Sequence, residues 1–240
     1  ALLIAGFGTL ISLFPFHSWA APAYASAPAP VAMMHAGVLK KFGLYGLFMF
    51  QPLMETGFLP WTNILLVLLV CNVIWVGYVT VNQKRLDLLL GNSSVMHMGY
   101  IFLAFAALVV SGSAEANPWA LKGAALLMLA HGLTIALLFL LCGQIEKQTG
   151  TLEINSLGGL STRLPRMAFV FGLAGMASIG LPGLANFPGE FMVFFSGFAG
   201  FSNGFGPVQI ATILCLWGLV IGAVYMLRAY RNIFQGDLSK

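Results

Sequence analysis

Ionisable side chains interrupt several long apolar runs of this sequence. They are His35, Lys40, Lys41, His97, Lys122, His131 and Glu190. A charged group at the centre of a bilayer costs about 2.5–3.5 kcal/mol on insertion scales, so such a residue marks an ion path unless it has another explanation. Amines, imidazoles and carboxylates all exchange protons with water or with each other. Proton transfer within a membrane is therefore the chemistry that these residue types suggest.

Two adjacent lysines lie in the middle of residues 31–50, VAMMHAGVLKKFGLYGLFMF. About 20 residues of helix cross a bilayer of about 30 Å, which puts both amines too far from either surface to reach water along their stems. Because neighbours on a helix point about 100° apart, we expect one lysine in the functional interior. Gly37, Lys41 and Tyr45 share a helix face, which favours Lys41. The alternative is a lysine that merely pairs with a neighbouring helix.

Glu190 is the carboxylate that we predict at membrane depth. It follows Gly189 inside the stretch GLPGLANFPGEF, residues 180–191, whose two prolines and three glycines cannot continue a regular helix. A half-helix that restarts there would present free N–H groups and the positive end of its dipole. Glu190 is therefore either a proton-exchanging group or a cap for that half-helix, and the two roles are compatible.

Four other ionisable residues are harder to interpret. His131 lies near the middle of residues 119–142, and His97 lies about one turn into residues 92–111, nearer an interface. Each is either a relay group or a hydrogen-bonded core residue, and the other buried titratable groups favour relays. Lys122 is close enough to a helix start to reach the surface along its stem. His35 remains ambiguous.

The composition excludes most soluble classes of protein. Hydrophobic residues make up 59% of the 240 residues and charged residues 8%, against roughly 25% charged in soluble domains. The fold class is therefore an all-α polytopic membrane protein. The net charge of +4 follows membrane topology and does not indicate a nucleic-acid partner. The three cysteines lie far apart, and no nucleotide or metal motif is present, so we expect no redox cofactor and no metal site in this chain.

Apolar runs and loop charge together predict about seven transmembrane helices. We place them at residues 1–14, 31–50, 62–81, 92–111, 119–142, about 167–201 as one discontinuous helix, and 208–227. From residue 62 onward, loops with and without lysine or arginine alternate, as the positive-inside rule requires. Gln51-Pro52 should end the second helix, and the three prolines of residues 17–31 predict a non-helical connection. The whole chain forms one expected domain, 1–240.

Several sequence blocks resemble the antiporter-like membrane subunits of respiratory complex I, the proton-translocating NADH:quinone oxidoreductase. In chain order they are FPFHSW, APAPVAMMHAGVLKKFGLYGL, KRLDLLLGNSSVMHMGYIFL, LMLAHGLTIALLFLLCGQI, LEINSLGGL and GLPGLANFPGEF. These blocks cover most of the chain and are similar to the C-terminal half of such a subunit. The start at Ala1, without a methionine, fits an expected fragment of a longer protein. A glutamate in the broken helix resembles the chain M (subunit 4) type.

The resemblance implies roles for individual residues. Lys41 matches a lysine of the proton relay, His97 and His131 match polar residues of the central axis, and Glu190 matches a terminal carboxylate on the exit side. Lys40 stands where the family usually has an apolar residue. The family pattern also has a lysine seven residues before the first histidine, where this chain has Leu10.

The implied function is coupling of quinone reduction to proton pumping, through Lys41, Lys40, His97, His131 and Glu190. NADH, FMN, iron–sulfur clusters and quinone are then expected in partner subunits, with other membrane subunits and lipid as neighbours and a quinone-reducing module at a distance. The bacterial inner membrane is the expected location. One alternative is the membrane subunit of a related hydrogenase or of an Mrp-type cation/proton antiporter. A second is a structural subunit that pumps nothing, which Leu10 favours.

Overall fold

The computed structural model describes residues 2–199 and 204–236. Apart from one isolated antiparallel bridge between Arg85 and Glu153, these residues contain no β structure. In chain order the helices are α1 (Leu2–Ile11), α2 (Ala20–Ser26), α3 (Ala29–Met34), the π-helical turn η1 (His35–Leu39), α4 (Lys40–Phe58), η2 (Leu59–Trp61), α5 (Thr62–Val81), α6 (Leu86–Ser111), α7 (Pro118–Thr149), η3 (Ile154–Ser156), α8 (Leu160–Arg163), α9 (Pro165–Ile179), α10 (Asn186–Gly197) and α11 (Pro207–Phe234). The predicted all-α class is confirmed.

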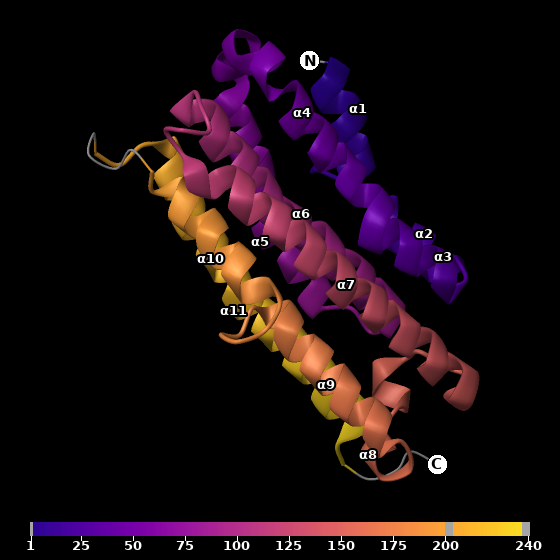
Figure 1. The fold of residues 1–240 in the computed structure, drawn as a ribbon. Helices are drawn as coiled ribbons and strands as arrows, with labels where there is room; N and C mark the ends of the chain where they lie inside the picture. The colour runs from indigo at the N-terminus through magenta and orange to yellow at the C-terminus, as the bar shows by residue number, and fades with distance from the viewer. Residues whose placement is uncertain (1, 200–203, 237–240) are drawn as a thin grey trace.

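Helix α6 forms the centre of the bundle. Nearly all of its residues are buried, and it packs against α5, α7, α2, α10 and α11. In Figure 1, α9, α10 and α11 lie along one side of α6 and α7, and α1 to α4 lie along the other. An apolar helix that is covered all round can accept polar side chains only where partners are supplied, because an unpaired polar group in hydrocarbon is costly. Buried polar side chains of α6 therefore mark the positions at which neighbouring helices supply polar partners.

Four described helical segments are long and apolar enough to cross a membrane: residues 59–81, α6, α7 and α11. Two shorter apolar helices, α1 and α9, are too short to do so alone. The remaining apolar sequence is divided into shorter pieces or interrupted by the two lysines. These helices establish a multi-pass arrangement, but they do not by themselves establish the predicted count of about seven.

Helix boundaries match the sequence in one case and extend beyond it in three. Residues 62–81 form α5 as predicted. Helix α6 begins at Leu86 and not at 92, because Asn92 Nδ2 donates to the Leu88 carbonyl at 3.0 Å and is accommodated inside the helix. His97 is consequently the twelfth residue of α6, so its predicted position about one turn from the helix start is wrong. Helices α7 and α11 also continue past their predicted ends, to Thr149 and Phe234.

The prediction that residues 17–31 are non-helical is wrong. Most of the segment is helical, in α2 and the start of α3. Pro22 is the third residue of α2 and Pro30 the second residue of α3. The first turn of a helix has no intrahelical use for its N–H groups, so proline is tolerated there. The prolines therefore start two short helices here.

Gln51-Pro52 does not end a helix either, because α4 continues through Pro52 to Phe58. Proline removes one backbone hydrogen bond, but neighbouring turns and packing can keep a membrane helix intact around it.

The predicted break near residue 180 is confirmed. Helix α9 ends at Ile179, α10 begins at Asn186, and Gly180 and Gly183 between them have positive φ angles of 78° and 89°. Only glycine adopts such angles without strain. The helix resumes earlier than the sequence indicates, because Pro188 occupies the third position of α10, where no N–H is required.

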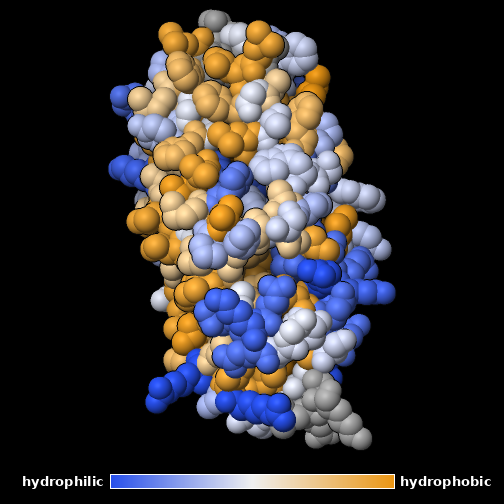
Figure 2. Space-filling model, turned by 90° about the vertical axis from the view of Figure 1, so that its right-hand side faces the viewer, coloured by the Kyte–Doolittle hydropathy of each residue, from blue (hydrophilic) through white to orange (hydrophobic). Residues whose placement is uncertain are grey.

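Basic side chains collect at one end of the bundle. The end of α11 meets the start of α6 there, since Arg228 Nη2 donates to the Gln83 carbonyl at 2.7 Å. The bridge between Arg85 and Glu153 brings a third loop to the same end, and Asp87 raises the pKa of Arg85 through a hydrogen bond and charge. Figure 2 shows hydrophilic side chains gathered toward its lower end. The gathering of these loops agrees with the alternation of charge along the sequence.

Candidate functional site

Glu190 is buried beside the broken helix. It is the fifth residue of α10, 2% exposed, and its Oε1 lies 3.8 Å from His97 Nε2 on α6. A methyl group at Gly180 would collide with its carboxylate, so the glycine that opens the break also makes room for the acid. The N-cap residue of α10 is Ala185, and Glu190 is the fifth residue of the helix, beyond the four whose N–H groups lack a partner within the helix. The possibility that Glu190 caps the half-helix is therefore wrong.

A surface groove borders this carboxylate. Glu190 lines a groove of about 320 Å³ together with Gly180, Phe187, Phe191 and further aromatic side chains. Among the described residues, Oε1 of Glu190 has no hydrogen-bond partner. The acid therefore borders open space on one side and a histidine on the other.

His97 contacts two backbone carbonyls. Its Nδ1 lies 2.8 Å from the Ser93 oxygen, and its Nε2 lies 3.0 Å from the Ser178 oxygen near the end of α9. A neutral imidazole has one N–H and can donate to only one of them, whereas an imidazolium has two and satisfies both. The surroundings of His97 thus fit its cationic form, with the Glu190 carboxylate as the nearby opposite charge.

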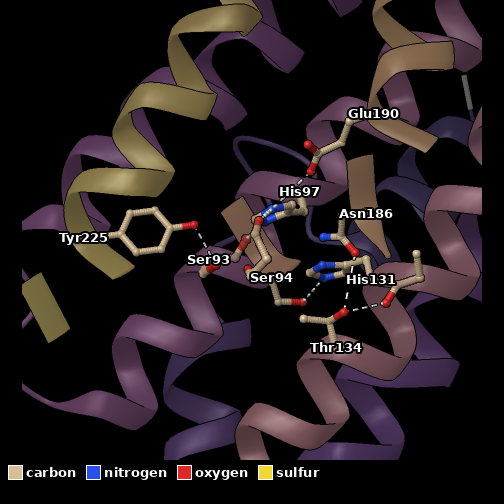
Figure 3. Close-up of polar contacts among 10 residues, drawn as sticks. Ser93, Ser94, His97, His131, Thr134, Asn186, Glu190 and Tyr225 are labelled. Atoms are coloured by element: carbon tan, nitrogen blue, oxygen red, sulfur yellow. Dashed lines mark hydrogen bonds and ion pairs between the residues drawn. The ribbon is translucent and has the colours of Figure 1, made fainter. Parts of the chain in front are cut away.

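His131, on α7, continues the row. Its ring stacks on that of His97 with centroids 4.7 Å apart and planes 16° apart. Its Nε2 lies 3.4 Å from Ser94 Oγ, and its Nδ1 has no hydrogen-bond partner among the described residues. Figure 3 shows Glu190, His97 and His131 following one another across α10, α6 and α7. A buried acid and two imidazoles are thereby brought into direct succession.

Lys41 lies next along the row. Its Nζ donates to the Ala36 carbonyl, and its Cε is 4.0 Å from the position that a methyl group on Gly132 would take, one residue from His131. Helices meet closely at this point, because a Cβ at Gly132 would lie 2.6 Å from the Gly37 oxygen. As predicted, Gly37, Lys41 and Tyr45 share a face, which lines a groove of about 670 Å³ against α7.

Burial does not distinguish the two lysines, so the expectation that one of them faces the functional interior stays a prediction. Lys40 is fully buried and Lys41 is 7% exposed. The two side chains leave the helix on different sides, as the rotation per residue requires, but both sides are covered. Nζ of Lys40 lies 5.7 Å from the centroid of the Tyr24 ring on α2 and has no hydrogen-bond partner among the described residues. Helix α2, which the sequence did not predict, buries the side of α4 that carries Lys40.

Other polar residues of the site were not singled out from the sequence. Ser93 Oγ and the Tyr225 hydroxyl are 2.7 Å apart and join α6 to α11. Thr134 Oγ1 lies 3.5 Å from Asn186 Oδ1 at the start of α10. Ser93 could have been noticed as a polar residue one turn from His97, and Asn186 as the amide within the break. Tyr225 stands in a long apolar helix and gives no such signal.

Two further expectations concern residues outside the row. Lys122 is exposed as the fifth residue of α7, and its reach to the membrane surface along its stem stays a prediction. Across the described residues, no group of three or more His, Cys, Asp or Glu side chains is placed to hold a metal ion.

A family profile identifies the arrangement. The profile described as the NADH:quinone oxidoreductase/Mrp antiporter transmembrane family matches residues 1–220. The chain belongs to this family. The resemblance found in the sequence blocks is thereby confirmed, and the chain is a multi-pass membrane protein.

Individual members of the family are clearly similar. The chain is 35% identical over 240 residues to NAD(P)H-quinone oxidoreductase chain 4 2 of Microcystis aeruginosa, covering 99% of this chain and 42% of that protein. It is 32% identical over 241 residues to NADH-quinone oxidoreductase subunit M of Rickettsia felis, covering 100% and 45%. A chain of respiratory complex I from Thermus thermophilus superimposes with a TM-score of 0.87 at 27% identity, covering 99% and 48%. This chain therefore spans less than half the length of the curated relatives it matches.

Proposed function

We propose that this chain is the proton-translocating part of a chain-M-type subunit of NADH:quinone oxidoreductase. The observation that supports the proposal most directly is the buried row Lys41, His131, His97 and Glu190, which crosses from α4 to the broken helix α9–α10. Apolar helices surround this row, where titratable groups are costly unless they serve transport. The row is not sealed, because its two ends border grooves.

In the proposed mechanism, protons move along the row by way of water molecules between the groups. The neutral amine of Lys41 accepts a proton, and the resulting ammonium passes that proton toward His131 and His97. Glu190 receives it and releases it to the exit side. The Ser93 and Ser178 carbonyls hold both nitrogens of His97 in place for donation. No bond other than those to the transferred protons forms or breaks, and no electron passes through these residues.

Coupling between neighbours follows from their separation. Two unit charges 3.8 Å apart, the distance from His97 Nε2 to Glu190 Oε1, interact by about 4 kcal/mol at an effective dielectric constant of about 20. When Glu190 releases its proton to the exit side, the restored carboxylate stabilises an imidazolium at His97 and so favours transfer of the next proton from the Lys41 end of the row. A charge change elsewhere in the complex would shift the protonation of the residues in the row by the same electrostatic interaction.

The wider assembly is part of the proposal. We take α9 and α10 as one discontinuous crossing and residues 1–240 as a single membrane domain with about seven crossings, in line with the loop charges. NADH, FMN, iron–sulfur clusters and quinone would reside in partner subunits, with a quinone-reducing module at a distance. Other membrane subunits and lipid would surround the chain in a bacterial inner membrane or another energy-transducing membrane.

The test is Glu190→Gln in the assembled complex. The carboxamide keeps the shape of the side chain but cannot exchange a proton, so proton translocation and coupled turnover should be lost while assembly remains. Glu115→Gln, at an exposed carboxylate between α6 and α7, is the matched control and should behave as wild type. Wild-type coupling in Glu190→Gln would refute the proposed function.

An Mrp-type cation/proton antiporter is the second candidate, because the family profile includes both kinds of complex. Sodium dependence of transport in vesicles, and the soluble subunits that co-purify with the chain, separate the two. Quinone reduction that drives proton uptake without sodium supports the oxidoreductase.

A further inference from the structure

Lys40 carries a buried amine outside the row that ends at Glu190. The side chain has no exposed surface, and Nζ has no hydrogen-bond partner among the described residues. Burying an ammonium without a partner is costly. The aromatic face of Tyr24 offers electrostatic compensation, with its ring centroid 5.7 Å from Nζ. A cation–π contact of this length compensates only in part, so the position of Lys40 calls for a further explanation.

The hydroxyl group of Tyr24 leads from Lys40 to a third titratable side chain. It lies 3.2 Å from Nδ1 of His35, within hydrogen-bond distance. Tyr24 is 3% exposed, whereas His35 is only partly buried and its ring also packs edge-on against Trp19. An imidazole within reach of the outside, a buried phenol and a buried amine therefore follow one another in space.

The π-helical turn η1 aligns the two ends of this cluster. The backbone N–H of Lys40 donates to the His35 carbonyl, five residues earlier. In a regular α-helix, side chains five residues apart point about 140° away from each other. A π turn contains one more residue, so residues five apart lie nearly over one another, and such turns recur at functional sites. Both His35 and Lys40 consequently contact Tyr24.

We propose that His35 and Tyr24 form a proton-transfer pair that loads Lys40, as a second branch beside the row through Lys41. This inference rests on the proposed function. A proton leaves Nδ1 of the His35 imidazolium for the Tyr24 oxygen as the phenol releases its own proton. Because Nζ of Lys40 lies over the ring and not at the hydroxyl, one water molecule carries that second proton to the amine. No electron moves, and the phenol carries no net charge at the end.

Tyr24→Phe is the decisive variant, because it keeps the aromatic ring over Lys40 and removes only the hydroxyl. The measurement is the number of protons translocated per quinone reduced by the whole complex in sealed vesicles. We expect Tyr24→Phe, His35→Gln and Lys40→Leu to lose the same part of this ratio. The double variant Tyr24→Phe/His35→Gln should lose no more than either single variant, because residues acting in one chain of transfers are not additive.

His17→Gln is the matched control. His17 is also half-buried in the same region, but its ring packs on Phe14 and makes no hydrogen bond to Tyr24. The control should keep the wild-type ratio. A wild-type ratio in Tyr24→Phe, together with a loss in Lys40→Leu, would mean that the ring alone serves the lysine and would overturn the proposal. A wild-type ratio in Lys40→Leu would overturn it as well.

A spectroscopic measurement on the wild-type complex tests the proposal even where a variant fails to assemble. Infrared difference spectra of the wild-type complex during turnover should contain a tyrosine C–O band that shifts with imidazole protonation and is absent in Tyr24→Phe. A tyrosine that stays silent in the wild type overturns the proposal. Glu190→Gln, measured in parallel, separates failure of the Lys40 branch from failure of the proposed function. If Glu190→Gln abolishes translocation while Tyr24→Phe has no effect, only the proposal for the Lys40 branch fails. If Glu190→Gln translocates normally, the proposed function itself fails.

Discussion

The carbonyl oxygen of Ser178 lies 3.0 Å from Nε2 of His97. In an uninterrupted helix this oxygen would accept a hydrogen bond from the residue four positions later, but that residue is Pro182, which has no N–H. The break therefore exposes one backbone acceptor and directs it at the histidine beside Glu190. Proline and glycine in this segment do more than interrupt α9, because they supply part of the environment of the proton-exchanging groups.

Gly180→Ala should disturb the site more than an ordinary glycine substitution. A left-handed residue with a Cβ costs about 1–2 kcal/mol, and here the added methyl group would also displace the Glu190 carboxylate. We expect reduced thermal stability together with a large loss of coupled turnover. Gly150→Ala is the matched control, since φ is 73° there and nothing lies within 4 Å of the added atom. Equal coupling in both variants would contradict the role of the contact between residues 180 and 190.

Lys41→Met should abolish proton translocation, whereas Lys40→Leu should have a milder effect. Methionine keeps most of the volume of lysine beside Gly132 but cannot hold a proton, and Lys41 stands in the main row. Proton uptake by vesicles during quinone reduction measures both effects. Lys122→Met, at an exposed lysine near the start of α7, should leave uptake unchanged. A stronger effect of Lys40→Leu than of Lys41→Met would reverse the assignment of the main path.

His131→Phe separates packing from proton exchange. The phenyl ring can still stack on His97, whose ring centroid is 4.7 Å from that of His131, but it has no nitrogen to carry a proton. The complex should assemble with near-normal thermal stability. It should lose coupled turnover by about a hundredfold, the lower end of the range for loss of a proton-transferring group. Unchanged turnover would show that His131 serves only as a packed ring.

Tyr225→Phe tests the link between α6 and α11. The change removes the hydrogen bond to Ser93 Oγ and leaves that buried hydroxyl unpaired, at an expected cost of about 1–3 kcal/mol. The midpoint of thermal denaturation should fall. The double variant Ser93→Ala/Tyr225→Phe should be less destabilised than the sum of the single variants, because no unpaired partner then remains. An additive result would argue against a hydrogen bond between the two groups.

The sequence predicts the ionisable residues of the site better than their surroundings. Lys41, His131 and Glu190 stand out because charge or imidazole in an apolar run is rare, and the break near Gly180 stands out because proline and glycine cluster there. Their assembly into a row depends on tertiary packing. No local pattern indicates that the rings of His97 and His131 stack, or that Gly37 and Gly132 allow two helices to meet.

The errors have physical causes that particular residues illustrate. The prediction begins this helix at residue 92, which puts His97 too near a surface, whereas α6 begins at Leu86. There Arg85 pairs with Asp87, and Asn92 bonds within its own helix. Pro22 and Pro30 read as breakers, although each stands in a first turn. Local propensity does not reveal whether a neighbour will satisfy a polar group or whether a proline will fall at a helix start.

The five-residue turn η1 has a consequence for how this chain can change over generations. Because the turn holds one residue more than a regular helix would, deleting Val38 should convert it into a regular turn and leave α4 with its present orientation relative to α3. The two adjacent amines would then keep their surroundings. Losing a single codon here is therefore expected to disturb the membrane interior less than the same loss in a regular turn, where everything that follows would rotate by about 100°.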